Sequence, residues 1–133
     1  MSAPIDGRGE ELLQGKNFCT VATLRGDGSV HVVPVWVDVQ DGEPVLNSAE
    51  GRVWVRNLER DPRVTLTVQN HENPYEYLEV RGRAREPERN GADEHIDSMA
   101  KKYLGADSYP GRQPGEQRVI IRVEPEHAKV HGG

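Results

Sequence analysis

The sequence predicts a mainly β fold with peripheral helices: a small antiparallel barrel that carries helices at its rim. About six segments have the composition and spacing of strands, and tight glycine-containing turns join several of them. No repeated strand–helix–strand pattern indicates a parallel sheet. Because 133 residues is the size of one domain, we treat residues 1–133 as a single domain.

The N-terminal half is expected to supply one helix and three strands. Residues 1–9 are small, polar and rich in glycine, which predicts a mobile N-terminus, and residues 10–14 form a short helix. Residues 18–24 are the first strand, residues 30–39 the second and residues 44–49 the third. Asp-Gly turns connect these strands, and Asp-Gly is a strong hairpin signal.

The second strand contains the unusual run HVVPVWV. Proline cannot donate to a β-ladder, which places Pro34 at an edge, a bulge or a strand start. One face of the segment suits the barrel core and consists of Val33, Val35, Val37 and Val39. The opposite face is also apolar and consists of Val32, Pro34 and Trp36. A monomer would leave this second face exposed to solvent, so we expect another molecule or segment to cover it.

The middle of the chain is predicted to form a helix and two strands. Residues 51–60 are helical and stop before the Asp61-Pro62 pair, since the residue before a proline disfavours the α region. Residues 63–69 alternate between apolar and polar side chains. Residues 76–86 form a long strand whose outer face carries arginines.

The C-terminal part is predicted to contain one more helix and one more strand. Apolar residues recur at helical spacing over residues 93–104, and Gly105 closes that helix. Residues 106–116 are a loop rich in proline and glycine. Residues 117–124 form the last strand, and residues 125–133 are expected to be a C-terminal tail.

Composition excludes several classes of partner. The net charge of -5 argues against nucleic acid, because phosphate binding needs a basic surface. A single cysteine, Cys19, rules out an internal disulfide and suits a reducing compartment. No segment has the character of a signal peptide or a membrane span. We therefore expect a cytoplasmic protein with neither nucleic-acid nor membrane partners.

No catalytic residue can be assigned from a sequence motif. Cys19 lies inside a strand, which favours a buried structural thiol over a nucleophile. His127 and His131 are four residues apart, but they follow Pro125 without evident partner ligands, so we expect no metal site. The phosphate-binding, dinucleotide-binding and serine-hydrolase motifs do not occur.

The segment NSAEGRVWVRN (residues 47–57) carries the clearest candidate site. A strand ends at Asn-Ser, a glycine follows and a helix begins, so Ser48 could cap the helix, whose free N–H groups attract anions. Arg52 and Arg56 lie on one helix face and could clamp a phosphate or a carboxylate. The alternative is a solvated arginine-lined helix that pairs with the acidic residues near its end. Both interpretations stay open on these residues alone.

A series of motifs resembles one known superfamily. In order they are FCTVATL (18–24), an Asp-Gly turn, VPVW (33–36), Asn-Ser (47–48), RNL (56–58) and RDPR (60–63), followed by NPYEY (73–77), VRG (80–82) and KYLG (102–105) with Tyr-Pro (109–110). Together they resemble the flavin/deazaflavin oxidoreductase superfamily of the pyridoxamine 5'-phosphate oxidase-like type, and in particular its F420-dependent branch. The resemblance covers residues 10–130.

The resemblance implies a six-stranded antiparallel split β-barrel of the FMN-binding type. It also implies a homodimer with two cofactor sites at the interface. The residues lining the ring pocket would be Pro34, Val35 and Trp36. Those meeting the ribityl and phosphate portion would be Asn47, Ser48, Gly51 and Arg52, with Arg56 and Asn57 nearby. The residues that could close the site from the other subunit would be Tyr75 and Tyr77.

One departure from the family pattern bears on the choice of cofactor. The family commonly has a lysine three residues before its Asn-Leu pair, and this chain has Trp54 there. A basic residue that would meet the phosphate or the oligoglutamate tail is therefore missing. Trp54 could instead stack on the ring or pack in the core. Ser48 replaces the more usual threonine and keeps the hydroxyl.

The resemblance implies an F420-dependent reductase that delivers a hydride to a small-molecule acceptor. The cofactor carries the difficult chemistry, while the protein positions the ring and excludes water. The candidate proton donors are Tyr77, Tyr103, Tyr109 or a bound water. Two alternatives remain: an FMN-binding oxidase or reductase of the same fold, and a non-catalytic protein that binds a cofactor or a tetrapyrrole.

Overall fold

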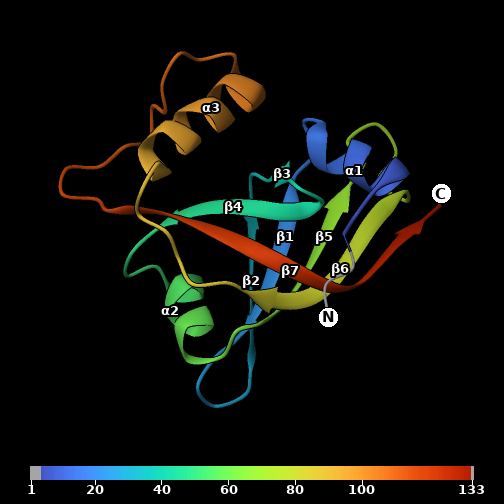
Figure 1. Cartoon of the computed structure of the whole chain (residues 1–133), viewed down its shortest axis with the longest axis horizontal. Coiled ribbons are helices and arrows are strands. Elements are labelled where there is room, and N and C mark those ends of the chain that lie inside the picture. Colours follow the sequence, from blue (N-terminus) through green and yellow to red (C-terminus); the bar gives the residue numbers. More distant parts are fainter. Residues whose placement is uncertain (1–3, 133) are drawn as a thin grey trace.

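The computed structural model describes residues 4–132. Within them the chain forms a mainly β structure with three helices (Figure 1). The elements in order are α1 (Gly7–Gln14), β1 (Cys19–Leu24), β2 (Val30–Val35), β3 (Asp38–Gln40), β4 (Glu43–Ala49), α2 (Val53–Arg60), β5 (Arg63–Gln69), β6 (Tyr77–Ala84), α3 (Ala92–Leu104) and β7 (Arg118–His131). No helix in this part of the chain is long and apolar enough to cross a membrane.

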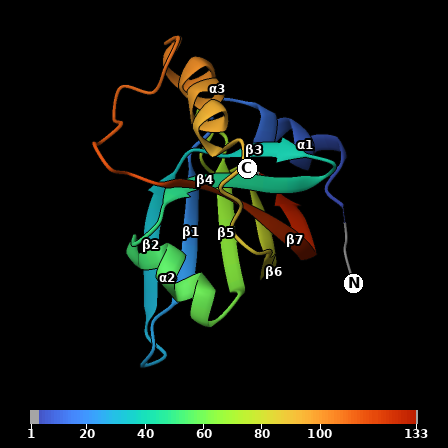
Figure 2. The same ribbon diagram turned by 60° about the vertical axis from the view of Figure 1, so that its left-hand side comes forward.

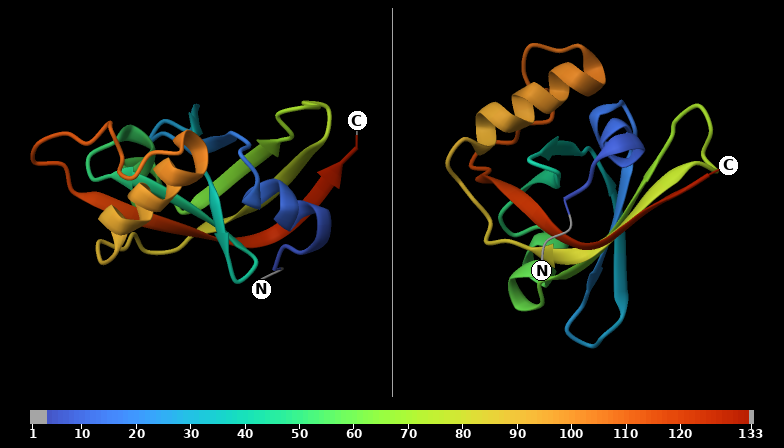
Figure 3. Two further views of the ribbon diagram at one scale, coloured as in Figure 1. Left: turned by 90° about the horizontal axis from the view of Figure 1, so that it is seen from above. Right: turned by 45° about the vertical axis from the view of Figure 1, so that its right-hand side comes forward.

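The seven strands form one antiparallel sheet in the order β2-β1-β5-β6-β7-β4-β3. The sheet curls on itself, with α1 and α3 at one end and α2 at the other (Figures 2 and 3). This arrangement confirms the predicted split-barrel class. The seventh strand arises because the segment predicted as one strand, residues 30–39, is divided into β2 and β3.

The division lies at Trp36 and Val37, where the chain crosses from one edge of the sheet order to the other. Side chains of α3 complete the hydrogen bonds of this bend. The Tyr103 hydroxyl accepts from the Val37 amide at 3.1 Å, and Lys102 Nζ donates to the Val37 carbonyl at 2.7 Å. The continuous apolar pattern could not reveal the break, because the Val37 backbone groups are hydrogen-bonded by side chains some 65 residues later in the sequence.

The core fills the inside of the curl. Val37 is fully buried, and Val33, Val35 and Val39 pack against the core as expected. The outward side of β2 is uncovered in the single chain, since Val30 and Val32 are 54% and 57% exposed. An exposed apolar face on an edge strand usually packs against a partner.

Both chain ends differ from the prediction. Ile5 is buried, and its amide donates to the Gly42 carbonyl at 2.8 Å. Because α1 then begins at Gly7, residues 4–9 are anchored rather than mobile. The remaining residues of the predicted mobile segment, 1–3, lie outside the described part of the chain.

The predicted C-terminal tail is largely strand, because β7 continues to His131. The register against β6 shifts between Arg81 and Gly82, and Gly82 then faces Pro125. A bulge tolerates a proline, which has no N–H to donate. Gly82 is required there, because a Cβ atom would lie 2.1 Å from the Glu124 carbonyl oxygen. The proline therefore marks a bulge and not the end of the strand.

Candidate functional site

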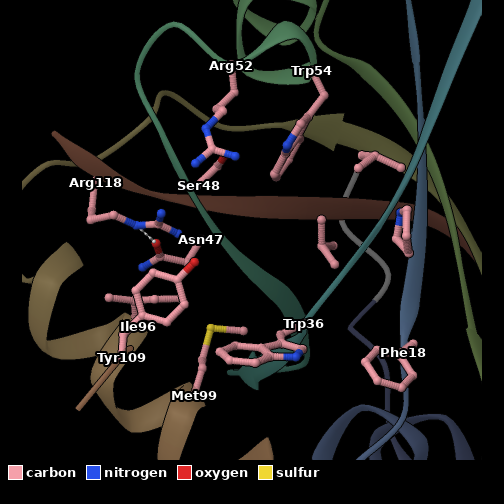
Figure 4. A pocket seen from close by; sticks show the side chains of 13 residues that line it. Phe18, Trp36, Asn47, Ser48, Arg52, Trp54, Ile96, Met99, Tyr109 and Arg118 are labelled. Carbon is pink, nitrogen blue, oxygen red and sulfur yellow. Dashed lines mark hydrogen bonds between the residues drawn. The ribbon is translucent and has the colours of Figure 1, made fainter. Parts of the chain in front are cut away.

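A cleft of about 340 Å³ lies between the start of α2 and the inner side of α3 (Figure 4). The end of β2, the strands β4 and β7, and the 106–116 loop complete its walls. Its lining residues are Phe18, Val33, Pro34, Val35, Trp36, Asn47, Ser48, Arg52, Trp54, Ile96, Met99, Tyr109 and Arg118. The volume is in the range of small-molecule sites.

One end of the cleft is apolar and aromatic. The Trp36 ring stacks on Tyr103, with centroids 5.1 Å apart and planes 5° from parallel. Tyr109 meets Trp36 edge-on at 5.9 Å. Met99 lies beside Trp36 on the same wall (Figure 4). This end offers flat apolar surface against which a planar ring can pack.

The other end is polar and positively charged. Arg118 is only 5% exposed, and it donates from Nη1 to Glu116 at 3.2 Å. Its guanidinium also lies 5.2 Å from the centre of the Tyr109 ring. Arg52 reaches the second oxygen of Glu116 at 3.4 Å. Two arginines share one carboxylate, so the three side chains together carry one net positive charge. Such a site attracts an anionic group.

Asn47 connects this polar end to α3. Its Oδ1 accepts from Arg118 Nε at 2.9 Å, and its Nδ2 donates to the Ala92 carbonyl at 2.9 Å. The same Nδ2 lies 3.1 Å from His95 Nδ1, and His95 Nε2 lies 3.3 Å from Asp38 Oδ2. The hydrogen bond from His95 lowers the pKa of Asp38 below its usual value.

The structure brings together most of the predicted site residues. Those that line the cleft are Pro34, Val35, Trp36, Asn47, Ser48, Arg52 and Trp54. Gly51 lies just outside, in a turn whose φ of 90° favours glycine. Arg56 is exposed on α2, one turn after Arg52, and is not among the lining residues.

Asn57, Tyr75 and Tyr77 lie elsewhere in the single chain. Asn57 is buried, and its amide donates to Thr23 Oγ1 at 3.0 Å, which is a packing role. Tyr75 and Tyr77 line a separate hollow of about 590 Å³ beside β5. The expectation that these tyrosines close the site from another subunit stays a prediction.

The predicted helix start is wrong in one respect. Ser48 lies within β4, opposite Val119, and does not cap the helix. α2 begins at Val53 with Arg52 in the N-cap position and has no side-chain cap. The strand continues one residue beyond Ser48 because Ala49 still pairs with Arg118 of β7. Ser48 presents its side chain to the cleft instead.

Several lining residues were not predicted to belong to the site, namely Phe18, Val33, Ile96, Met99 and Arg118, whereas Tyr109 was predicted only as a candidate proton donor. Ile96 and Met99 belong to the apolar face of α3, and their spacing indicates only core packing. Arg118 had a detectable signal: it is a charged residue directly before the apolar run VII. A buried arginine needs partners, which marks such a position for attention.

The proposed proton donors differ in position. Tyr103 donates to the Asn17 carbonyl at 2.7 Å, and burial raises its pKa to about 12. Tyr77 stacks on His131, at 4.6 Å between ring centres, away from the cleft. Of the three tyrosines, Tyr109 lines the cleft.

Cys19 and the histidine pair do not form a reactive centre. Cys19 is fully buried as predicted, and desolvation raises the pKa of its thiol. His131 lies 2.9 Å from Glu79 on the strand pair β6–β7. Within residues 4–132, no three side chains of His, Cys, Asp or Glu come together in a way that could hold a metal ion.

The curled antiparallel sheet and its cleft define a protein of the flavin/deazaflavin split-barrel class. The chain belongs to the pyridoxamine 5'-phosphate oxidase family, whose model matches residues 5–132. A search of curated proteins finds no match to the chain.

Solved structures support the same fold. The chain is similar to an F420 reductase at 27% identity, with a TM-score of 0.80 over 94% of this chain and 98% of that chain. A pyridoxamine 5'-phosphate oxidase-like protein from Listeria innocua is 18% identical, with a TM-score of 0.65 over 85% and 86% of the two chains. A conserved protein from Mycobacterium tuberculosis is 20% identical, with a TM-score of 0.70 over 96% and 86%.

Proposed function

We propose that the protein is an F420-dependent oxidoreductase that transfers a hydride between the deazaflavin and a small organic acceptor. The observation that carries the proposal is the two-ended cleft: a flat aromatic wall at one end and two arginines with one shared carboxylate at the other. A ring that carries a phosphate-bearing tail needs both ends. The similarity to an F420 reductase over nearly the whole chain supports the same choice.

Each part of the cleft then has a defined task. Pro34, Val35 and Trp36 pack against the ring and keep water from it, and Arg52 and Arg118 bind the anionic tail. When bound, the deazaflavin supplies the hydride chemistry. Tyr109, which lines the cleft, would hold a proton near the ring. This division explains how the protein acts without a nucleophile–base pair.

FMN is the second candidate cofactor, and Trp54 is the observation that favours it. Trp54 is 5% exposed in the wall of the cleft, so this position supplies apolar surface and no positive charge. A longer anionic tail would gain less from such a wall than the compact phosphate of FMN. Both cofactors fit the same division into an aromatic end and an arginine end.

Titration of the purified protein with F420 and with FMN tests the proposal. We expect saturable binding of F420, visible in its absorption spectrum, at a lower concentration than binding of FMN. Tighter binding of FMN would favour the second candidate. Reduced F420 should then be oxidised by some member of a panel of quinones and activated alkenes. Tight binding without any turnover would instead indicate a non-catalytic cofactor-binding or tetrapyrrole-binding protein.

We also propose that two copies associate through the outward side of β2. This side exposes Val30, Val32 and Pro34, and Pro34 also lines the cleft. Burial of this face against a second copy would supplement a hydrophobic content of only 35%. Sedimentation equilibrium should show a dimer for the wild type and a monomer for Val32→Glu. Leu104→Glu, at an exposed leucine of α3, is the matched control and should remain dimeric.

A further inference from the structure

The amide of Asn47 can satisfy its neighbours in one orientation only. Its Oδ1 faces Arg118 Nε, which is a donor, and its Nδ2 faces the Ala92 carbonyl oxygen, which is an acceptor. An amide nitrogen has two protons to donate and accepts none. Since Nδ2 also lies 3.1 Å from His95 Nδ1, that ring nitrogen must accept. The polar network therefore determines the tautomer of His95.

His95 consequently carries its proton on Nε2. That nitrogen lies 3.3 Å from Asp38 Oδ2, which accepts the bond. The His95 side chain is 13% exposed, so little water is available to replace either partner. The order of donors is thus continuous: Arg118 donates to Asn47, Asn47 donates to His95, and His95 donates to Asp38.

A second proton on His95 breaks this order. Nδ1–H would then face the protons of the Asn47 amide, and the amide would have to turn to present its oxygen. After the turn, the amide nitrogen would face Arg118 Nε, and the Ala92 carbonyl would lose its donor. Arg118 would retain the Glu116 carboxylate and the Tyr109 ring. Histidine is the side chain that changes charge near neutral pH.

We propose that His95 is a positioning residue that acts through Asn47 to hold Arg118 in the cleft. The affinity of the cleft for a phosphate-bearing ligand consequently depends on the protonation of His95. This inference rests on the proposed function, because it takes the anionic tail of F420 or FMN as the group that Arg118 binds. It adds a regulating group from α3 to a site built by β4 and β7.

Three charged groups around His95 favour or oppose the addition of its second proton. Asp38 from β3 faces Nε2 directly and favours the protonated ring. Lys102 of α3 acts on Asp38, and Arg118 of β7 lies behind Asn47; both positive charges oppose a second proton. Asp38→Asn keeps an acceptor for Nε2 but removes the negative charge. That variant should therefore move the transition to lower pH.

Long-range ¹H–¹⁵N spectra of the ligand-free protein test the tautomer without any cofactor. Above the transition, we expect His95 to show a bare Nδ1 and a protonated Nε2. The Nε–H signal of Arg118 should be observable there and should weaken as His95 gains its second proton. The opposite tautomer, or an Arg118 signal that ignores His95, would overturn the inference.

Binding of FMN and of F420 between pH 5.5 and 8 tests the consequence. As the pH falls and His95 gains its second proton, the affinity of the wild type should fall by about tenfold, the equivalent of one lost hydrogen bond. His95→Asn offers an amide oxygen to Asn47 and does not titrate, so its affinity should not show this transition. His71→Asn, the same change at an exposed histidine, should follow the wild type.

The phosphate monoester of FMN also changes its charge near pH 6. Dividing the wild-type affinity by the His95→Asn affinity at each pH cancels this contribution of the ligand. A ratio that stays constant with pH would contradict the inference while leaving the cofactor proposal intact. Failure of both FMN and F420 to bind any variant would defeat the proposed function instead. The ligand-free spectra would then decide the coupling of His95, Asn47 and Arg118.

Discussion

The two helices that flank the cleft contribute to it in different ways. α2 follows the Asn-Ser-Ala-Glu-Gly segment and brings Arg52 and Trp54 to the lining, and the Arg52 side chain is 55% exposed. α3 brings Ile96 and Met99 to the lining, and three of its polar side chains, those of His95, Lys102 and Tyr103, bond to groups inside the molecule. His95 contacts Asn47, while the last turn of α3 binds the β2–β3 bend. The start of α2 therefore contributes mainly side chains that line the cleft. α3 contributes lining side chains too, and it also holds in place the neighbouring segments that shape the cleft.

This difference has a physical cause. α2 begins at a turn of the cleft wall, where water reaches its first residues. α3 packs on β7 and β4 and reaches the bend between β2 and β3, where the Val37 backbone groups pair with its side chains and not with a strand. Figure 3 shows where α3 lies relative to the sheet. Buried carbonyl and amide groups must be satisfied, and Lys102 and Tyr103 satisfy them. Changes in α3 should therefore affect stability, and changes near the start of α2 should affect ligand binding.

The largest expected effect is on Lys102. Its ammonium donates to the carbonyls of Leu13 and Val37, and burial lowers its pKa. Lys102→Met keeps the aliphatic stem but leaves both carbonyls unpaired, so we expect a loss of about 3 kcal/mol in the free energy of unfolding. Urea denaturation measures this loss. Lys101→Met, at the exposed neighbour, should change stability by less than about 0.5 kcal/mol. Equal effects at the two positions would contradict the role of α3 at the β2–β3 bend.

How far the sequence predicts the fold depends on where each hydrogen bond is satisfied. The alternation in residues 63–69 predicted β5 with its bounds, because its partners are neighbouring strands. The bend at Trp36 could not be predicted, because its partners are side chains on α3. The extension of β7 beyond Pro125 was missed for a related reason, since only Gly82 of β6 allows the bulge there.

The next largest effect is the loss of cofactor affinity when Arg118 or Arg52 is replaced. Arg118 is buried and fixed by Asn47, so solvent screens its charge less than that of Arg52, whose side chain is 55% exposed. Arg118→Gln should weaken binding of the cofactor by about thirtyfold, or about 2 kcal/mol, and Arg52→Gln by only about threefold. Isothermal titration of both variants, each checked for a native circular dichroism spectrum, measures the difference. A larger effect at Arg52 would assign the anionic tail to α2.

The site was predicted where the family motif and the cleft coincide, as at Pro34 and Trp36. It was missed where residues far apart in the sequence meet. Arg118 and Asn47 are 71 residues apart, and the pairing of β4 with β7 brings them together. No local spacing indicates such a pair. Conversely, Asn57 belongs to the motif, but its amide is used to hold Thr23.

A smaller effect is expected at Tyr103, and it depends on pH. Tyr103→Phe removes the bonds to Asn17 and Val37 and should cost about 1 kcal/mol at pH 8. Burial raises the pKa of Tyr103 from 10 to about 12, so the folded state keeps a proton that the unfolded state loses above pH 10. This contribution is complete below pH 10 and is lost as the pH rises to 12. The advantage of the wild type over the variant, followed by urea denaturation, should therefore shrink over that interval. A constant difference would show that the hydroxyl is not protected.

The smallest effect is expected where α3 holds the 106–116 loop against the cleft. Asp97 Oδ1 accepts from the Tyr109 amide and from Arg112, each at 2.8 Å, whereas Asp93 contacts Arg112 alone. Asp97→Ala should cost only about 0.5 kcal/mol of stability, since the site is near the surface. Hydrogen exchange at the Tyr109 amide should nevertheless become faster, because its acceptor is gone and the loop can open locally. Asp93→Ala should leave that exchange rate unchanged. If both variants speed exchange equally, Arg112 rather than the Tyr109 amide holds the loop, and the influence of α3 on the aromatic end is indirect.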